Sequence, residues 1–184
     1  MSFDPIQHLL DEHVVILARF EKLQAAVDAV RTDGEDALAT QLDTFRAIGE
    51  MMATQLHRHA RKEDEAFFPA IEAVLGAAQG PTTVMRAEHQ QIYAQGALLR
   101  DTLYQLNEVE HPQIEANRDR LRELARIGKS GAALADTGAE ILHLVHMHFE
   151  KEEQVLFPMA REMLSAETMD RIADAMAAID SEGA

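Results

Sequence analysis

The chain has 184 residues, of which 47% are hydrophobic and 5% aromatic, with a net charge of −15. This length and composition predict one folded domain with its own core and exclude a disordered or fibrous protein. The acidic charge argues against nucleic acid and anionic membranes as partners, and with no cysteine the available metal ligands are nitrogen and oxygen atoms. We see neither a membrane span nor an export signal, so we expect a cytoplasmic protein.

The first half of the chain is predicted to form two long helices. The first helix begins after Asp4, a favourable N-cap residue, with Pro5 in its first turn, and it ends near Gly34. Apolar residues recur along it at the spacing of a helix. The second helix runs from about residue 35 to residue 67, and Pro69 disrupts or ends it.

The second half of the chain repeats this arrangement with more interruptions. The predicted elements, in chain order, are a helix from Pro81, a break at 110–112, a polar helix at 113–127, a break at 128–131, a helix that reaches Pro158, and an amphipathic helix from about Ser165 to Ile179. No strand pattern is present. The predicted fold is all-α, an up-down-up-down four-helix bundle with short additional helices. Residues 1–160 would form the bundle and residues 161–184 a C-terminal helix packed on it.

The two halves share a motif. The segments HARKEDEAFFP at 59–69 and HFEKEEQVLFP at 148–158 both place a glutamate four residues after a histidine and a proline ten residues after it. Each half also has an earlier Glu-His pair, which ends at His13 in the first half and at His89 in the second. These correspondences predict a duplicated helical hairpin whose halves pack about a pseudo-two-fold axis.

Six residues of this repeat are candidate metal ligands: His13, His59, Glu63, His89, His148 and Glu152. Residues four apart share a face of a helix, and the apolar neighbours of each pair indicate that this face is the core face. An unpartnered imidazole or carboxylate in a core costs several kcal/mol, so the six groups need a common partner. Four imidazoles and two carboxylates suit two divalent ions, each bound by two histidines, with both glutamates bridging.

This pattern resembles that of the hemerythrin-like, HHE cation-binding domain proteins, and the resemblance covers roughly residues 4–160. It implies a four-helix bundle with a non-haem centre of two Fe ions, oxo- or hydroxo-bridged. His13 and His59 would then bind one iron and His89 and His148 the other, while Glu63 and Glu152 bridge them. Zinc or manganese are possible substitutes for iron, because they accept the same ligands. Iron–sulfur repair members of the family carry a cysteine-containing segment, which argues against that branch here.

Two departures from the oxygen-carrying hemerythrins argue against oxygen transport. Tyr93 stands where those proteins have a fifth histidine, and Glu152 follows its histidine by four residues where they have an aspartate at five. The missing histidine leaves open positions on both ions, which admit dioxygen, peroxide or nitric oxide. Tyr93 is either a core tyrosine with a hydrogen-bonded hydroxyl or a residue that acts beside the iron.

The halves differ beyond these ligands, since Tyr93 and Gly96 in the second half replace Leu17 and Phe20 in the first. We therefore expect a cavity beside Gly96 and an exchangeable site on the iron of the second half, with Tyr93 at its edge. In the first half, the bulky Leu17 and Phe20 should fill this space, so that side should be closed to small molecules. Alternatively, Gly96 only permits a close helix crossing.

The remaining polar residues are predicted to be peripheral. His57 and His146 lie on another face of their helices, and His8, His111 and His143 are interpreted as surface residues. A further set is expected to be solvated, with some members supporting ligands from outside, namely Asp64, Glu65, Glu150 and Glu153.

The predicted function is the binding or sensing of dioxygen or another small redox ligand. The alternatives are an enzyme or stress-protection protein that acts on peroxide or nitric oxide, a protein for iron storage or handling, and a structural zinc site. The sequence identifies no protein partner.

Overall fold

The computed structural model describes residues 3–76, 80–107 and 117–182, and at residues 35, 107 and 117–129 it describes the backbone alone. All elements of the described residues are helical. They are α1 (Pro5–Asp33), α2 (Glu35–Met51), η1 (Met52–Leu56), α3 (His57–Lys62), η2 (Glu63–Phe67), α4 (Phe68–Leu75), α5 (Pro81–Asn107), α6 (Asn117–Lys151), η3 (Glu152–Leu156), α7 (Phe157–Met163) and α8 (Ala166–Glu182).

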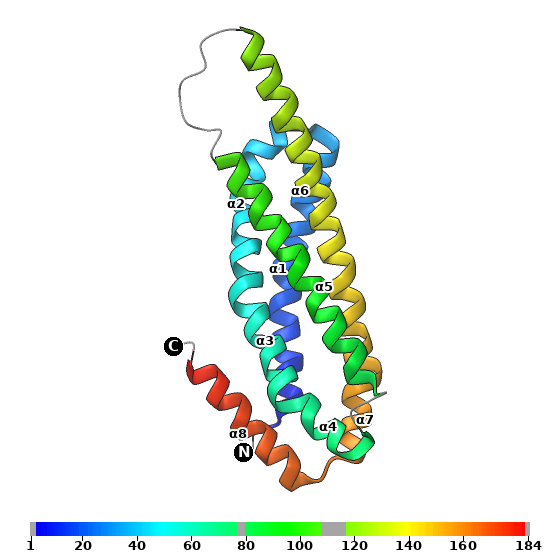
Figure 1. The fold of residues 1–184 in the computed structure, drawn as a ribbon. Helices are drawn as coiled ribbons and strands as arrows, with labels where there is room; N and C mark the ends of the chain where they lie inside the picture. The colour runs from blue at the N-terminus through cyan, green and yellow to red at the C-terminus, as the bar shows by residue number, and fades with distance from the viewer. Residues whose placement is uncertain (1–2, 77–79, 108–116, 183–184) are drawn as a thin grey trace.

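The long helices run alternately up and down one bundle (Figure 1). The segment α1 rises, α2 to α4 return, α5 rises again, and α6 with α7 returns beside it. Within the bundle, α1 packs on α2 and α6, and α5 packs on α6 and α2. The predicted all-α, up-down-up-down four-helix bundle is therefore confirmed. We call α1 to α4 the first half and α5 to α7 the second half. Among the described residues, no helix has the length and apolar character required to cross a membrane.

The predicted limits of the first helix are confirmed. The Oδ1 atom of Asp4 accepts hydrogen bonds from the backbone N–H of Ile6 at 3.0 Å and of Gln7 at 3.2 Å, and Pro5 occupies the first turn. Gly34 ends the helix at a φ of 62°, which glycine adopts without steric cost.

Neither Pro69 nor Pro158 ends its helix. The π-helical turn before Pro69 is a disruption, one of the two outcomes predicted for it, whereas the predicted helix end at Pro158 is wrong. The π-helical turn η2 precedes Pro69 and η3 precedes Pro158, and the chain continues as α4 and α7. In each turn a backbone N–H bonds the carbonyl five residues earlier, from Phe68 to Glu63 and from Phe157 to Glu152. We infer that the wider turn accommodates the missing proline N–H and the bulk of its ring.

The predicted break at 128–131 is wrong, because α6 continues through these residues. A Cβ at Gly131 would lie 3.2 Å from Leu38 Cδ2, so this glycine lets α6 approach α2 closely. Glycine inside a helix costs roughly 1 kcal/mol relative to alanine, and close packing offsets such a cost. The other predicted break, at 110–112, lies outside the described residues.

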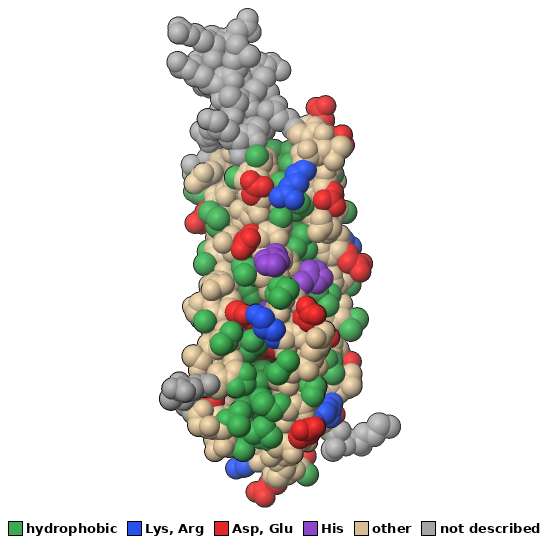
Figure 2. All heavy atoms as spheres, turned by 90° about the vertical axis from the view of Figure 1, so that its right-hand side faces the viewer, with side chains coloured by type: hydrophobic (Ala, Val, Ile, Leu, Met, Phe, Trp, Pro, Cys, Tyr) green, Lys and Arg blue, Asp and Glu red, His purple; other side chains and the backbone are tan. Residues whose placement is uncertain are grey.

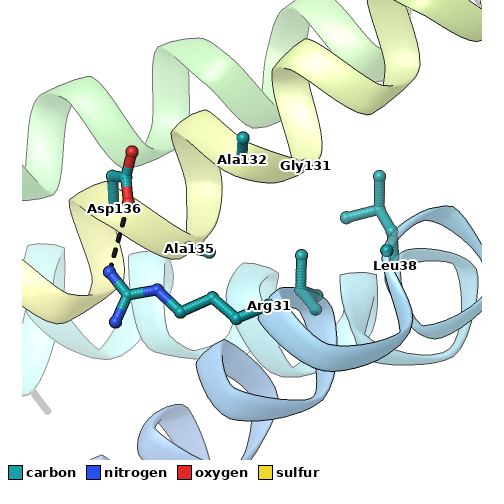
Figure 3. Close-up of a pocket in the computed structure, with 8 residues that line it drawn as sticks. Arg31, Leu38, Gly131, Ala132, Ala135 and Asp136 are labelled. Carbon is teal, nitrogen blue, oxygen red and sulfur yellow. Dashed lines mark hydrogen bonds and ion pairs between the residues drawn. The ribbon is translucent and has the colours of Figure 1, made fainter.

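Figure 3 shows this region, where a cavity of about 290 Å³ lies between α1 and α6. Arg31 and Asp136 form an ion pair of 3.1 Å beside it, with exposed side chains. The cavity lies far from the histidine repeat and offers no group of ligating side chains.

Two apolar clusters fill the bundle, one on each side of the histidine layer. The larger cluster contains Ile16 and Phe45, and the smaller contains Ile6 and Phe67. The C-terminal helix α8 packs on α1, α3 and η2, and it contributes to the smaller cluster. The division of the chain into residues 1–160 and 161–184 stays a prediction.

Candidate metal centre

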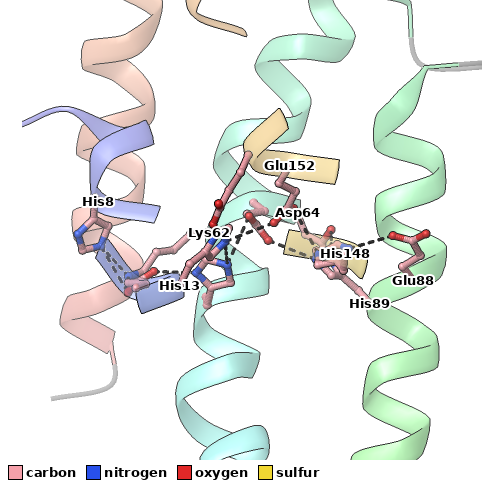
Figure 4. Close-up of polar contacts among 12 residues, drawn as sticks. His8, His13, Lys62, Asp64, Glu88, His89, His148 and Glu152 are labelled. Carbon is pink, nitrogen blue, oxygen red and sulfur yellow. Dashed lines mark hydrogen bonds and ion pairs between the residues drawn. The ribbon is translucent and has the colours of Figure 1, made fainter. Parts of the chain in front are cut away.

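The structure brings all six candidate residues together in the interior of the bundle (Figure 4). Each is at most 2% exposed. They come from six elements: His13 from α1, His59 from α3, Glu63 from η2, His89 from α5, His148 from α6 and Glu152 from η3. Both glutamates are the first residues of π-helical turns, and such turns are frequent at functional sites.

The six residues form two overlapping groups of four, each able to hold a metal ion. One group contains His13 and His59, whose Nε2 atoms are 3.1 Å apart. The other contains His89 and His148, with Nε2 atoms 2.9 Å apart. Both glutamates belong to both groups.

The two carboxylates connect the imidazole pairs. Glu152 places one oxygen 3.4 Å from His13 Nε2 and the other 3.3 Å from His148 Nε2. Glu63 likewise reaches His59 at 3.5 Å and His89 at 3.2 Å. All four carboxylate oxygens are buried, and none has a hydrogen-bond partner among the described residues.

Each imidazole is oriented by a carboxylate on its other nitrogen, Nδ1. The pairs are His13 with Glu153 at 2.7 Å, His59 with Glu12 at 2.9 Å, His89 with Asp64 at 3.1 Å, and His148 with Glu88 at 3.1 Å. A carboxylate accepts a hydrogen bond, so Nδ1 carries the proton and the neutral imidazole presents a lone pair at Nε2. With Nδ1 protonated, two Nε2 atoms about 3 Å apart repel each other unless they share a proton or a metal cation.

Two lysines extend these contacts in a symmetric way. Lys62 Nζ lies 2.5 Å from Glu12 Oε1 and 2.6 Å from Asp180 Oδ1, and the lysine side chain is fully buried. Lys151 pairs with Glu88, but its side chain is 41% exposed. The duplicated halves thus share the chain of contacts lysine, glutamate, histidine.

The pKa values of the buried candidate ligands move in different directions. Burial and the charge of Glu63 raise the pKa of Glu152 well above its usual range. Burial lowers the pKa of His148 to about 4. Burial also opposes the charged form of His89, but Asp64 and Glu63 raise its pKa to about 9. Buried carboxylates that compete for few protons are stabilised together by a cation.

Beside these residues, a cavity of about 150 Å³ is lined by Met52, Ala53, His57, Tyr93, Gly96 and Arg100. The expected cavity at Gly96 is therefore present. The Tyr93 ring is 6.2 Å from the His89 ring and 5.2 Å from the His57 ring, measured between centroids. On the opposite side Phe20 is fully buried, in agreement with the expected seal.

The peripheral residues agree with the predictions except at His8. His57, His146 and His143 are exposed, and His111 lies outside the described residues. His8 is only 25% exposed in its side chain, and its Nε2 is 2.9 Å from Lys62 Nζ, so its interpretation as a surface residue is wrong. Of the four acidic residues expected to be solvated or to support ligands, Asp64 and Glu153 contact the Nδ1 atoms of candidate ligands, as expected.

The sequence interpretation missed Glu12 and Glu88, although a signal was present. Each glutamate directly precedes the first candidate ligand of its half, in LLDEH and in VMRAEH. The buried Lys62 had no such signal, because an amphipathic pattern treats lysine as a solvated residue.

With this geometry established, comparison with known proteins identifies the family. A family model described as the hemerythrin HHE cation binding domain matches residues 4–130, more than half of the chain. The chain belongs to the hemerythrin HHE cation-binding domain family. No significant match exists among the curated proteins or the solved structures that were compared. The HHE match ends before His148 and Glu152. The fold nevertheless places these two residues in the two groups of candidate metal ligands described above.

Proposed function

We propose that this HHE protein holds two iron ions and binds dioxygen or another small redox ligand at them. The ligands would be His13 and His59 for one ion, His89 and His148 for the other, and Glu63 and Glu152 for both. The observation that supports this assignment best is that each buried carboxylate reaches both imidazole pairs, with no hydrogen-bond partner for its oxygens.

The donor atoms fit iron. Imidazole and carboxylate groups suit divalent iron, zinc and manganese, and membership of the HHE family favours iron among them. The protein offers each ion two nitrogen and two oxygen atoms, fewer than the six ligands of an octahedral shell. When bound, iron supplies a redox-active pair of ions with coordination positions open to a small molecule.

The surrounding residues keep the centre dry and rigid. The Phe149 ring stacks on His13 with a centroid distance of 3.7 Å, and the Phe68 ring stacks on His89 at 5.8 Å. Four carboxylates fix the tautomers of the imidazoles, as described above. A site held in this way binds its metal with little reorganisation.

Access for a small molecule would pass the Tyr93–Gly96 cavity. None of the six proposed ligands lines this cavity, but Tyr93 does, and its ring stacks on that of His89 with a centroid distance of 6.2 Å. Burial and the nearby carboxylates of Asp64, Glu63 and Glu65 raise the pKa of Tyr93 above its usual value. The hydroxyl therefore keeps its proton at neutral pH and can donate a hydrogen bond to a ligand.

The test is anaerobic reconstitution of the metal-free protein with ferrous iron. We expect two tightly bound iron atoms per chain by elemental analysis, and an absorption change on titration with azide or nitric oxide. One tightly bound ion per fully loaded chain would contradict the dinuclear centre. More than two would instead indicate iron storage. Steady-state consumption of peroxide and nitric oxide separates the proposed binding from turnover.

A further inference from the structure

The first half of the bundle is covered by α8, and the contacts define what this cover requires. Ile172 and Met176 of α8 are buried in the smaller apolar cluster. One turn further along, Asp180 lies 2.6 Å from Lys62 Nζ and 3.2 Å from His8 Nε2. The helix thus presents two apolar residues four apart and a carboxylate four residues after the second.

The surface under α8 has a counterpart in the second half. The repeat relates His8 to Val84, Leu9 to Met85, Lys62 to Lys151, Ala66 to Val155 and Phe67 to Leu156. Because α8 packs on α1, α3 and η2, the equivalent surface is formed by α5, α6 and η3. These are the elements that carry the second set of residues.

This second surface is an apolar groove open to solvent. Its cavity of about 220 Å³ is lined by Pro81, Val84, Met85, Lys151, Val155 and Leu156. Val84 is 52% exposed and Val155 is 57% exposed, whereas Met85 and Leu156 form a buried floor. Figure 2 shows hydrophobic side chains gathered on the lower part of this face. We name these six residues the second-half groove.

The groove is more apolar than the surface that α8 covers. Val84 replaces a histidine and Val155 replaces an alanine at the equivalent positions. Lys151 remains at its edge, bonded to Glu88 as Lys62 is bonded to Glu12, and it is accessible to a further carboxylate. An exposed apolar surface with a charge at its rim is typical of an interaction site.

We propose that the second-half groove binds an amphipathic helix of a different protein. This helix presents two apolar residues four apart to Val84 and Val155, and a carboxylate four residues further on to Lys151. A second copy of this chain is disfavoured, because each copy carries a net charge of −15. The occupant's carboxylate would thereby join the chain of contacts from Lys151 through Glu88 to His148.

The probe for this proposal is a fluorescent peptide of residues 165–182, which carries the required pattern. Added to the full-length protein, it should bind saturably with one peptide per chain by fluorescence anisotropy. Val84→Asp and Val155→Asp should each weaken binding by roughly tenfold or more, because they place a charge in the apolar contact. Val14→Asp is the matched control on α1, where the valine is 69% exposed, and it should leave binding unchanged.

The carboxylate contact is tested by a double-mutant cycle. Lys151→Met in the protein and Asp180→Asn in the peptide should weaken binding by similar factors, and the combined change should cost no more than either one. Val84→Asp and Val155→Asp change no candidate metal ligand and no carboxylate that contacts one, so the iron content of these two variants is a separate readout for the proposed function.

Three results would overturn the proposal. The first is the absence of saturable binding by a protein whose helical circular dichroism is unchanged. The second is binding that persists in Val84→Asp and Val155→Asp, which would mean that the peptide exchanges with α8 on the first half. The third is a dimer of the unmodified chain that Val155→Asp dissociates, which would make a second copy the occupant.

Discussion

The two halves of the bundle supply matching groups to the centre but differ in what surrounds it. In the first half, Phe20 fills the space beyond the ligands and α8 covers the outer surface. In the second half, Gly96 leaves a cavity at the corresponding position and the outer groove is open. The histidines, the two glutamates and their carboxylate and lysine partners correspond in both halves, with Asp64 of the first half in the place of Glu153 of the second.

A further difference lies in the helix that faces the cavity. Residues Met52–Leu56 form a π-helical turn, but the equivalent residues of the second half, 141–145, belong to the regular helix α6. Met52 and Ala53 line the cavity, whereas their counterparts Ile141 and Leu142 are buried. The duplication therefore preserves the candidate ligands in both halves, while the cavity beside them lies on the Tyr93 side.

The largest expected effect is a loss of iron affinity that is the same for both halves. Glu63→Met and Glu152→Met should each reduce iron affinity at both imidazole pairs. The loss should exceed the roughly 10- to 100-fold that is typical when a residue contacts a metal ligand but not the metal. Each carboxylate spans both pairs, so neither variant should retain one ion selectively. Elemental analysis after dialysis measures the loss, and His146→Ala, at an exposed position, is the control with full occupancy.

Glu152→Met should also stabilise the metal-free protein. It removes a fully buried carboxylate whose pKa is raised well above its usual range and that has no hydrogen-bond partner among the described residues. We expect the free energy of unfolding in urea to rise by about 1–3 kcal/mol. A fall in stability without metal would show that this carboxylate serves the fold and not the ions.

The second prediction separates the halves. Glu12→Gln and Glu88→Gln should each weaken iron binding by roughly 10- to 100-fold, because each removes the partner of one imidazole. In unfolding experiments Glu12→Gln should cost about 2–3 kcal/mol, since Lys62 is fully buried. Glu88→Gln should cost less than about 1 kcal/mol, since Lys151 is partly exposed. Equal stability losses would contradict the sealing of the first half.

The contribution of Glu12 should also depend on pH. Burial would raise its pKa, but His59 and Lys62 lower it from 4.5 to about 2. A lowered pKa in the folded state contributes stability above the unfolded value, and this contribution disappears as pH falls. The stability difference between the metal-free parent and Glu12→Gln should therefore shrink from pH 4.5 to about pH 2.

The third prediction concerns access through the cavity. Gly96→Leu should slow the binding of azide or nitric oxide by roughly tenfold, because the new side chain fills the cavity beside Met52. Tyr93→Phe should accelerate dissociation through loss of one hydrogen bond, by roughly tenfold or less. Stopped-flow absorption measures both rates. Leu17→Met on the sealed side is the control, and unchanged rates in all variants with full iron would reject this path.

The smallest expected effect concerns helix starts. Asp4 caps α1 before Pro5, and its counterpart before Pro81 is Gly80, which has no side chain. A Cβ at Gly80 meets only ordinary contacts, at 3.6 Å from Gly76 O and 3.7 Å from Thr82 Oγ1. Gly80→Asp should stabilise the protein by a few tenths of a kcal/mol, roughly 1 °C in thermal unfolding. A gain that is absent at neutral pH would mean that no cap forms.

The features that the sequence predicted correctly depend on residues that are close together in the chain. Asp4 and Pro5 set the start of α1 through backbone chemistry, and the spacing of four between His59 and Glu63 puts both on one face. The repeat then placed all six candidate ligands in the interior without any knowledge of the packing.

What the sequence did not predict depends on contacts between distant residues. The π-helical turns η2 and η3 lie where a proline must fit inside a continuing helix, and helical periodicity does not register a single inserted residue. Gly131 was predicted to break the helix, because the sequence does not show that Leu38 packs against it. Lys62 is buried only because α8 covers it, and α8 comes more than a hundred residues later in the chain.

The centre also sets an order of events during biosynthesis. His13 and its partner Glu153 are 140 residues apart in the chain. A chain grows from its N-terminus at roughly 5–20 residues per second, so the first hairpin emerges several seconds before the last ligands do. During that interval it carries His13, His59 and Glu63 without the carboxylate of Glu152. Metal can therefore be captured at full affinity only once synthesis has passed residue 153 and the hairpins have docked.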